Sequence, residues 1–167
     1  MIQVYTGNGK GKTTAALGLA LRAQGAGLKV YIGQFVKSGC YSEIKALKKL
    51  THVKVEQFGA GCFIRRIPER KDLAMAKKGL KKAEAVISRK AYDVVILDEI
   101  NVALKLKLIE LSSVISLIKK TPRGIELVLT GRNAHPQVIK LADLVSEIKD
   151  KKHYYAKGLK ARKGIEL

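Results

Sequence analysis

The chain has 167 residues and a formal net charge of +19, from 33 lysines and arginines against 14 aspartates and glutamates. This length suits one domain over residues 1–167, and no apolar run approaches the roughly 18 residues of a membrane span. Cys40 and Cys62 form no Cys-x-x-Cys motif, which argues against a disulfide framework or a zinc site. Because the first predicted strand begins at Ile2, with no signal peptide before it, we expect a soluble, cytoplasmic protein without a membrane partner.

The positive charge predicts an anionic partner, since such a field attracts polyanions. ATP, another anionic cofactor, an acidic protein and nucleic acid are all candidates. Many lysines also fall in helical runs, where a solvated face is the simpler interpretation. Aromatic residues are only 5% of the chain and tryptophan is absent, so few side chains could stack on single-stranded bases. We therefore do not expect nucleic acid as a partner.

A glycine-rich loop follows the first strand, over residues 2–5, and leads into a helix predicted over residues 14–25. Its glycines allow backbone N–H groups to converge on an anion at the helix start, Lys12 can reach terminal phosphates, and the Thr13 hydroxyl can bind Mg²⁺. The usual Gly-x-x-x-x-Gly-Lys-Thr pattern would place its first glycine where this chain has Thr6. A plain turn is the alternative, but it leaves two lysines of the loop close together without an anion. The predicted ATP-binding residues here are Gly7, Asn8, Gly9, Lys10, Gly11, Lys12, Thr13 and Thr14.

Strand and helix patterns alternate along the rest of the chain, which predicts an α/β fold with a parallel sheet. The run at residues 29–35 is almost continuously apolar, as expected for a buried parallel strand. Further strands are predicted over residues 53–58, 92–99, 125–130 and 144–148, and helices over residues 42–50, 68–90, 101–107, 111–120 and 136–142. The segment after residue 150 is basic and mixed in character.

Adjacent carboxylates end the apolar strand at residues 92–99. Parallel strands bring their carboxyl ends to one edge, so Asp98 and Glu99 should lie beside the phosphate loop, where they could hold Mg²⁺ with Thr13. The alternative is that they only cap the next helix. Lys37 ends the second strand at the same edge, and Arg132 ends the fifth. Arg132 could contact a phosphate or ribose, or could support the sheet edge through an ion pair.

Two other groups of residues leave alternatives open. Cys62, Phe63 and Ile64 form an apolar cluster in the irregular segment 59–66, and they either face a ligand or fold back onto the core. His52 and His135 have no metal-binding spacing around them, so we interpret them as loop or capping residues.

Seven motifs, taken together and in order, resemble the P-loop type of ATP:corrinoid adenosyltransferase. They span nearly the whole chain, and a threonine in place of the first glycine of the loop occurs in few P-loop families. They are Thr6–Ala16 (TGNGKGKTTAA), Gln34–Lys37 (QFVK), Leu97–Ile100 (LDEI), Thr130–Arg132 (TGR), Ala142–Glu147 (ADLVSE), Lys152–His153 and Gly164–Glu166 (GIE). The resemblance implies a RecA-like three-layer fold around a mainly parallel sheet.

The resemblance also implies a reaction, in which the 5′-deoxyadenosyl group of ATP moves to Co(I) of cobalamin or another corrinoid and triphosphate is released. Such enzymes serve adenosylcobalamin biosynthesis or salvage. They are understood to hold ATP in the reverse direction along the loop, since the triphosphate is the leaving group. By position, Lys12, Thr13 and Glu99 would be the catalytic residues, with Asp98 supporting Mg²⁺ or Mn²⁺.

Further properties follow from the same resemblance. The loop from Gly61 to Ile64 would face the corrinoid, although better-known members have aromatic residues where this chain has Cys62 and Ile64. A homodimer and a flavodoxin-type electron donor would be the expected partners. A nucleic-acid-dependent RecA-like ATPase is the main alternative, because of the charge, and a small-molecule kinase is a third possibility that would need a basic lid.

Overall fold

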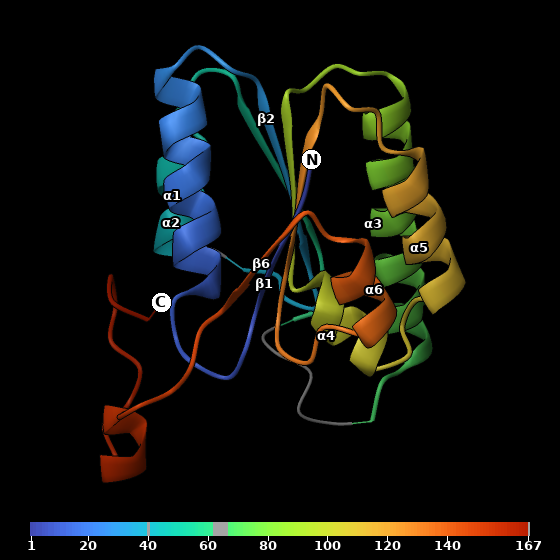
Figure 1. Ribbon diagram of the computed structural model, residues 1–167. Coiled ribbons are helices and arrows are strands. Elements are labelled where there is room, and N and C mark those ends of the chain that lie inside the picture. The colour runs from blue at the N-terminus through green and yellow to red at the C-terminus, as the bar shows by residue number, and fades with distance from the viewer. Residues whose placement is uncertain (40, 62–66, 167) are drawn as a thin grey trace.

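The computed structural model describes residues 1–39, 41–61 and 67–166, and forms three layers (Figure 1). The middle layer is a six-stranded sheet in the order β3-β2-β4-β5-β1-β6, and every neighbouring pair is parallel. The strands are β1 (Ile2–Thr6), β2 (Val30–Phe35), β3 (Val53–Phe58), β4 (Val94–Asp98), β5 (Glu126–Thr130) and β6 (Leu144–Glu147). This confirms the predicted α/β fold and its parallel sheet.

Helices cover both faces of the sheet. Figure 1 shows α1 (Lys12–Gly25) and α2 (Ser42–Leu47) on one face, and the other four helices on the opposite face. Those four are α3 (Arg70–Ser88), α4 (Ile100–Lys105), α5 (Leu111–Lys120) and α6 (Pro136–Leu141), and a short 3₁₀ helix, η1 (Tyr154–Lys157), lies in the C-terminal segment. None of the described helices is long and apolar enough to cross a membrane.

The core lies on both faces of strands β2, β4 and β5, which are buried along almost their whole length. Their residues are largely Val, Ile and Leu, which suit a strand covered on both sides. Helix α1 packs against one face through Ala16, Ala20 and Ala23, whose small side chains allow close approach. Among the strands of the described residues, β6 at the edge alone has exposed side chains along its whole length.

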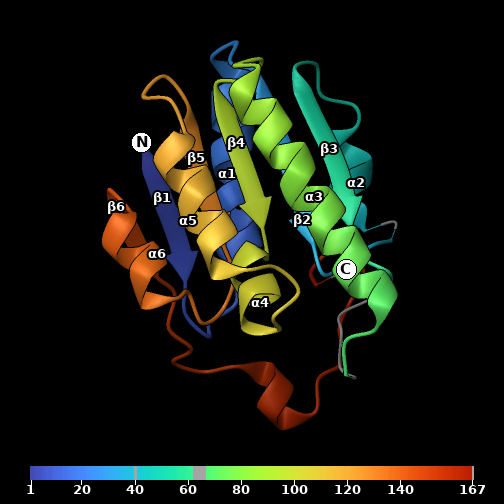
Figure 2. The same ribbon diagram turned by 90° about the vertical axis from the view of Figure 1, so that its right-hand side faces the viewer.

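Several helix boundaries differ slightly from the predicted ones. Helix α3 begins at Arg70, at the end of the predicted starting range of residues 68–70, because the Asp72 carboxylate accepts a hydrogen bond of 2.8 Å from the backbone N–H of Glu69 and so caps the first turn. Helix α2 ends at Leu47, three residues before the predicted end. These differences leave the position of the strand ends unchanged. Figure 2 shows that the phosphate loop, α4 and the C-terminal segment all lie at the carboxyl edge of the sheet.

Gly79 of α3 provides a test of the packing between helix and sheet. A Cβ atom at this position would lie 2.7 Å from the ring of Phe58 and 2.9 Å from that of Phe35, both of which are buried. We expect Gly79→Ala to lower the free energy of unfolding by about 1–3 kcal/mol, although alanine favours a helix. Gly18→Ala, in an exposed part of α1 with nothing within 4 Å, should instead stabilise the protein by up to about 1 kcal/mol. Equal effects in denaturant titrations would contradict this account of the packing.

Candidate functional site

The phosphate loop lies between β1 and α1, and Lys12 is the first residue of the helix. Its side chain is only 7% exposed, and its ammonium group donates a hydrogen bond of 2.6 Å to the carbonyl oxygen of Gly9. Gly11 precedes it with a φ of 120°, a conformation that favours glycine. Burial and the nearby Arg132 guanidinium lower the pKa of Lys12. The loop therefore holds a partly desolvated cation at the helix start.

Two glycines of the loop are required by close contact with the chain after β6. A Cβ atom at Gly7 would lie 2.4 Å from the carbonyl oxygen of Ile148, and one at Gly9 would lie 2.8 Å from it. The Gly9 N–H also donates a hydrogen bond of 2.7 Å to this oxygen. Besides the anion binding predicted from the sequence, the packing of residues 148–149 is therefore a second reason for glycine at these two positions.

Asp98, at the end of β4, connects the surrounding elements. Its carboxylate is 1% exposed. One oxygen accepts hydrogen bonds from the hydroxyls of Thr13 (2.9 Å) and Thr130 (2.7 Å). The other accepts a bond of 3.2 Å from the amide of Gln34 and lies 2.9 Å from the ammonium of Lys37. The predicted meeting of the phosphate loop and the carboxylates at one edge is therefore present in the structure.

The approach of Lys37 to Asp98 requires an unusual backbone conformation. Val36, just after β2, has a φ of 67°, which is rare for a β-branched residue. On the other side, Gly59 lies so close that a Cβ there would be 2.5 Å from the backbone of Lys37. These features turn the Lys37 side chain, which is 6% exposed, towards the carboxylate.

Glu99 differs from Asp98 in having no partner for its carboxylate among the described residues. Its backbone has a φ of 61°, and its N–H donates a hydrogen bond of 3.0 Å to the Thr130 hydroxyl. It occupies the N-cap position of α4, but its side chain makes no capping bond, so the simple capping interpretation fails. Burial, and then the Asp98 charge, raise the pKa of Glu99, and this outweighs the opposite effect of nearby cations. A half-buried, unpaired carboxylate beside a threonine hydroxyl suits a hard cation.

Arg132 follows β5 and is exposed, close enough to Lys12 and Glu99 to affect the pKa of each. It forms no ion pair with the described part of the chain, which disfavours the ion-pair interpretation. Gly131 before it has a φ of 127°, and a Cβ there would lie 3.1 Å from Asn101. Arg132 is therefore available to an anionic ligand.

The other predicted residues are placed less centrally. Asn8 and Thr14 are exposed, and Lys10 contacts the C-terminal segment. Cys62, Phe63 and Ile64, predicted to face the corrinoid, lie outside the described residues. His135 caps α6, since its imidazole accepts a hydrogen bond from the backbone of Gln137, as its interpretation as a capping residue predicts.

Sequence reasoning did not assign roles to Gln34 and Thr130, which hold Asp98 in place. Both were part of the quoted motifs, but their partner is on another strand. A polar residue near the end of a fully buried strand was the available signal, because such a side chain needs a hydrogen-bonding partner.

Comparison with known proteins confirms the resemblance proposed from the motifs. A family model described as ATP:corrinoid adenosyltransferase BtuR/CobO/CobP matches residues 1–167. A corrinoid adenosyltransferase from Pseudomonas aeruginosa is 35% identical over 169 residues, covering 100% of this chain and 83% of that protein. Another from Sinorhizobium sp is 36% identical, covering 100% of this chain and 80% of the relative. The corrinoid adenosyltransferase of Escherichia coli K12 is 33% identical, with 99% and 85% covered.

The unpaired Glu99 carboxylate predicts a pH-dependent stability. Because its pKa is raised in the folded chain, its contribution to stability is complete only below the unfolded pKa of about 4.3 and is lost as pH rises through the folded value. We expect Glu99→Gln to be more stable than the unmodified chain at pH 8, with the difference shrinking towards pH 4. Denaturant midpoints at several pH values would measure this. Glu84→Gln, on the exposed face of α3, is the control for removing a carboxylate, and a constant difference for Glu99→Gln across these pH values would contradict the prediction.

Proposed function

The chain belongs to the ATP:corrinoid adenosyltransferase family and transfers the adenosyl group of ATP to a corrinoid, and we propose that its phosphate loop binds the triphosphate as the leaving group. The observation that supports this assignment most directly is the hydrogen bond between Thr13 and Asp98, which joins the loop to the carboxylate strand. Lys12 and Arg132 add positive charge at the same edge. The positive charge of Lys12 and Arg132 complements the negative charge of a metal-bound triphosphate.

The transfer is a substitution at the ribose C5′ carbon. The Co(I) centre of the reduced corrinoid supplies the electron pair of the new Co–C bond, while the C5′–O bond breaks and its electrons leave with the triphosphate. Cobalt(I) is a strong nucleophile, so no nucleophilic side chain is needed. The protein must align the two reactants and stabilise the charge that develops on the departing oxygen. Lys10, Lys12 and the backbone N–H groups of the loop would perform the second task.

The residues at the edge fit Mg²⁺ or Mn²⁺. The Thr13 hydroxyl donates a hydrogen bond to Asp98, which leaves the lone pairs of the hydroxyl oxygen for a cation, and the Glu99 carboxylate has no partner among the described residues. Both oxygens of Asp98 already accept hydrogen bonds, so we assign Asp98 a supporting role and make Thr13 and Glu99 the ligands. A cation there would neutralise charge on the phosphate oxygens.

The remaining assignments concern the corrinoid and the partners. We propose that the segment containing Cys62, Phe63 and Ile64 contacts the corrinoid, since it follows β3 directly and β3 ends at this edge. A flavodoxin-type protein would deliver the electron that forms Co(I), and a homodimer would be the working state. Gel filtration and reduction assays with purified donor proteins would test these last two proposals.

The direct test is an anaerobic assay with reduced cobalamin or cobinamide and MgATP, followed by the corrinoid absorption spectrum and separation of phosphate products. We expect a light-sensitive alkylated corrinoid and inorganic triphosphate.

Lys12→Ala should lower the transfer rate by about 100-fold or more, because it removes charge stabilisation at the leaving group. Lys119→Ala, on the solvent side of α5, should have little effect.

Two results would contradict the proposal. If a verified Lys12→Ala variant transferred adenosyl groups at the unmodified rate at saturating MgATP, the phosphate loop would have no part in stabilising the leaving group. Accumulation of ADP and phosphate without alkylation, in response to DNA or RNA, would indicate a RecA-like ATPase instead. Unfolding curves of the variant would establish that any loss of transfer is a loss of chemistry and not of folding.

A further inference from the structure

The C-terminal segment, residues 148–166, runs across the carboxyl edge of the sheet. Figures 1 and 2 both show it leaving β6 and passing below the strand ends, and Figure 1 shows it returning on the side of α1. It contacts the phosphate loop twice. The first contact is the hydrogen bond between Gly9 and Ile148, and the second is made by Lys10. The segment therefore forms one side of the site.

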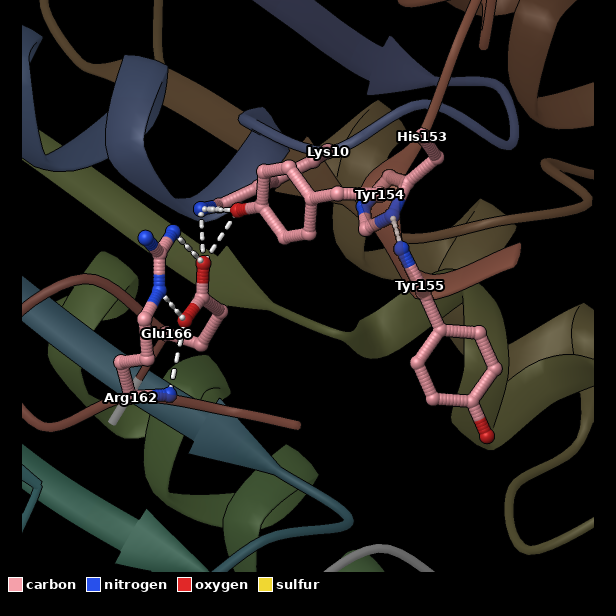
Figure 3. Close-up of polar contacts among 6 residues, drawn as sticks. All are labelled: Lys10, His153, Tyr154, Tyr155, Arg162 and Glu166. Atoms are coloured by element: carbon pink, nitrogen blue, oxygen red, sulfur yellow. Dashed lines mark hydrogen bonds and ion pairs between the residues drawn. The ribbon is translucent and has the colours of Figure 1, made fainter. Parts of the chain in front are cut away.

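The second contact is a cluster around Glu166 (Figure 3). The Lys10 ammonium donates hydrogen bonds of 2.7 Å to the Tyr154 hydroxyl and 2.8 Å to the Glu166 carboxylate. The Tyr154 hydroxyl in turn donates to the same oxygen of Glu166. Although Lys10 is 40% exposed, the Glu166 side chain is only 16% exposed, so solvent has limited access to the acceptor.

The C-terminal segment itself holds the acceptors of Lys10 in place. The Arg162 guanidinium donates to both oxygens of Glu166, at 3.1 and 3.3 Å, and the Arg162 backbone N–H donates at 2.8 Å. His153 caps η1 by accepting a hydrogen bond of 3.0 Å from the backbone of Tyr155. The Arg162 guanidinium also lies 5.0 Å from the centre of the Tyr154 ring. The Tyr154 hydroxyl and the Glu166 carboxylate, which accept the hydrogen bonds of Lys10, are thus held in place by contacts that do not involve Lys10.

The charges in the cluster are stable near neutral pH. Hydrogen bonds to Glu166 and Tyr154 raise the pKa of Lys10, and bonds from Arg162, Lys10 and Tyr154 hold the pKa of Glu166 well below its usual range. The lysine therefore remains a cation and the glutamate an anion. An ammonium group has three donors, and Tyr154 and Glu166 use two of them. One donor is left for an oxygen of a ligand on the loop.

We propose that Glu166 and Tyr154 are positioning residues that hold the Lys10 ammonium beside the phosphate loop for contact with the triphosphate of ATP. This inference rests on the proposed function, in which Lys10 stabilises the leaving group. A lysine side chain on a glycine-rich loop has many rotamers and loses conformational entropy when it is fixed on a ligand. If its rotamers are already restricted before ATP binds, this entropy cost does not weaken binding or slow the reaction. The segment acts on ATP through Lys10 and does not take part in bond breaking.

A double-mutant cycle tests this coupling. The variants are Lys10→Ala, Glu166→Gln and the two combined, with Tyr154→Phe as a second single variant that keeps the ring. The readouts are kcat and KM for ATP in adenosyl transfer, and the affinity for inorganic triphosphate with Mg²⁺ by calorimetry. We expect Glu166→Gln to lower kcat/KM by about tenfold, Tyr154→Phe by less, and Glu166→Gln to cause no further loss once Lys10 is alanine.

The matched control is Glu126→Gln. Glu126 is the first residue of β5, at the amino ends of the strands and away from the site, and its carboxylate accepts a hydrogen bond from Gln3. It should leave both readouts unchanged. Thermal unfolding of every variant separates loss of positioning from loss of folding. Because Glu166→Gln keeps the size of the side chain, we expect its unfolding midpoint to stay close to that of the unmodified chain.

The outcomes separate the two proposals. Independent, additive losses in the cycle would overturn the positioning role, and so would tighter triphosphate binding by Glu166→Gln, which would mean that the glutamate competes with phosphate for Lys10. Either result leaves the proposed function intact if the unmodified chain transfers adenosyl groups. Failure of the unmodified chain to alkylate a corrinoid would overturn the proposed function, while the triphosphate affinities would still measure the coupling.

Discussion

The buried ion pair between Asp98 and Lys37 is the interaction on which the geometry of the site depends. The two charges lie 2.9 Å apart, with side chains only 1% and 6% exposed. Removing both from water is costly, and their attraction offsets that cost only if the remaining hydrogen-bonding capacity is also satisfied. Thr13, Thr130 and Gln34 supply those hydrogen bonds. The same contacts fix the ends of β2, β4 and β5 relative to the start of α1.

This arrangement requires unfavourable backbone conformations at the strand ends. Val36 and Glu99 both have positive φ values, which cost energy in residues other than glycine. Gly59 and Gly131 allow neighbouring segments to approach them more closely than a side chain would permit. In the core below, by contrast, the strands follow their local preferences. Part of the backbone strain therefore lies at the edge where the functional side chains lie, although His52 and Lys90, near the starts of β3 and β4, also have positive φ values.

Local sequence patterns were sufficient to predict the strands, most of the helices and the two main motifs. Apolar runs that end in Lys37 or in Asp98 show which edge is polar, and a parallel sheet then brings those residues together. The specific partners could not be predicted in this way. Thr130 meets Asp98 because β5 lies beside β4, although the two residues are 32 positions apart. Strand order depends on packing across the whole domain, which no local window contains.

The cations at the carboxyl edge have different environments. Lys37 and Arg162 are paired with carboxylates of the same chain and contribute structure, whereas Lys10 is paired with Glu166 and keeps one donor for a ligand. Lys12 and Arg132 are close to each other, and burial together with Arg132 lowers the pKa of Lys12. A bound polyanion would relieve this repulsion and favour the charged form of Lys12. Relief of the repulsion between these cations therefore adds to the affinity for triphosphate. The site should bind a highly charged phosphate more tightly than a neutral ligand of similar shape.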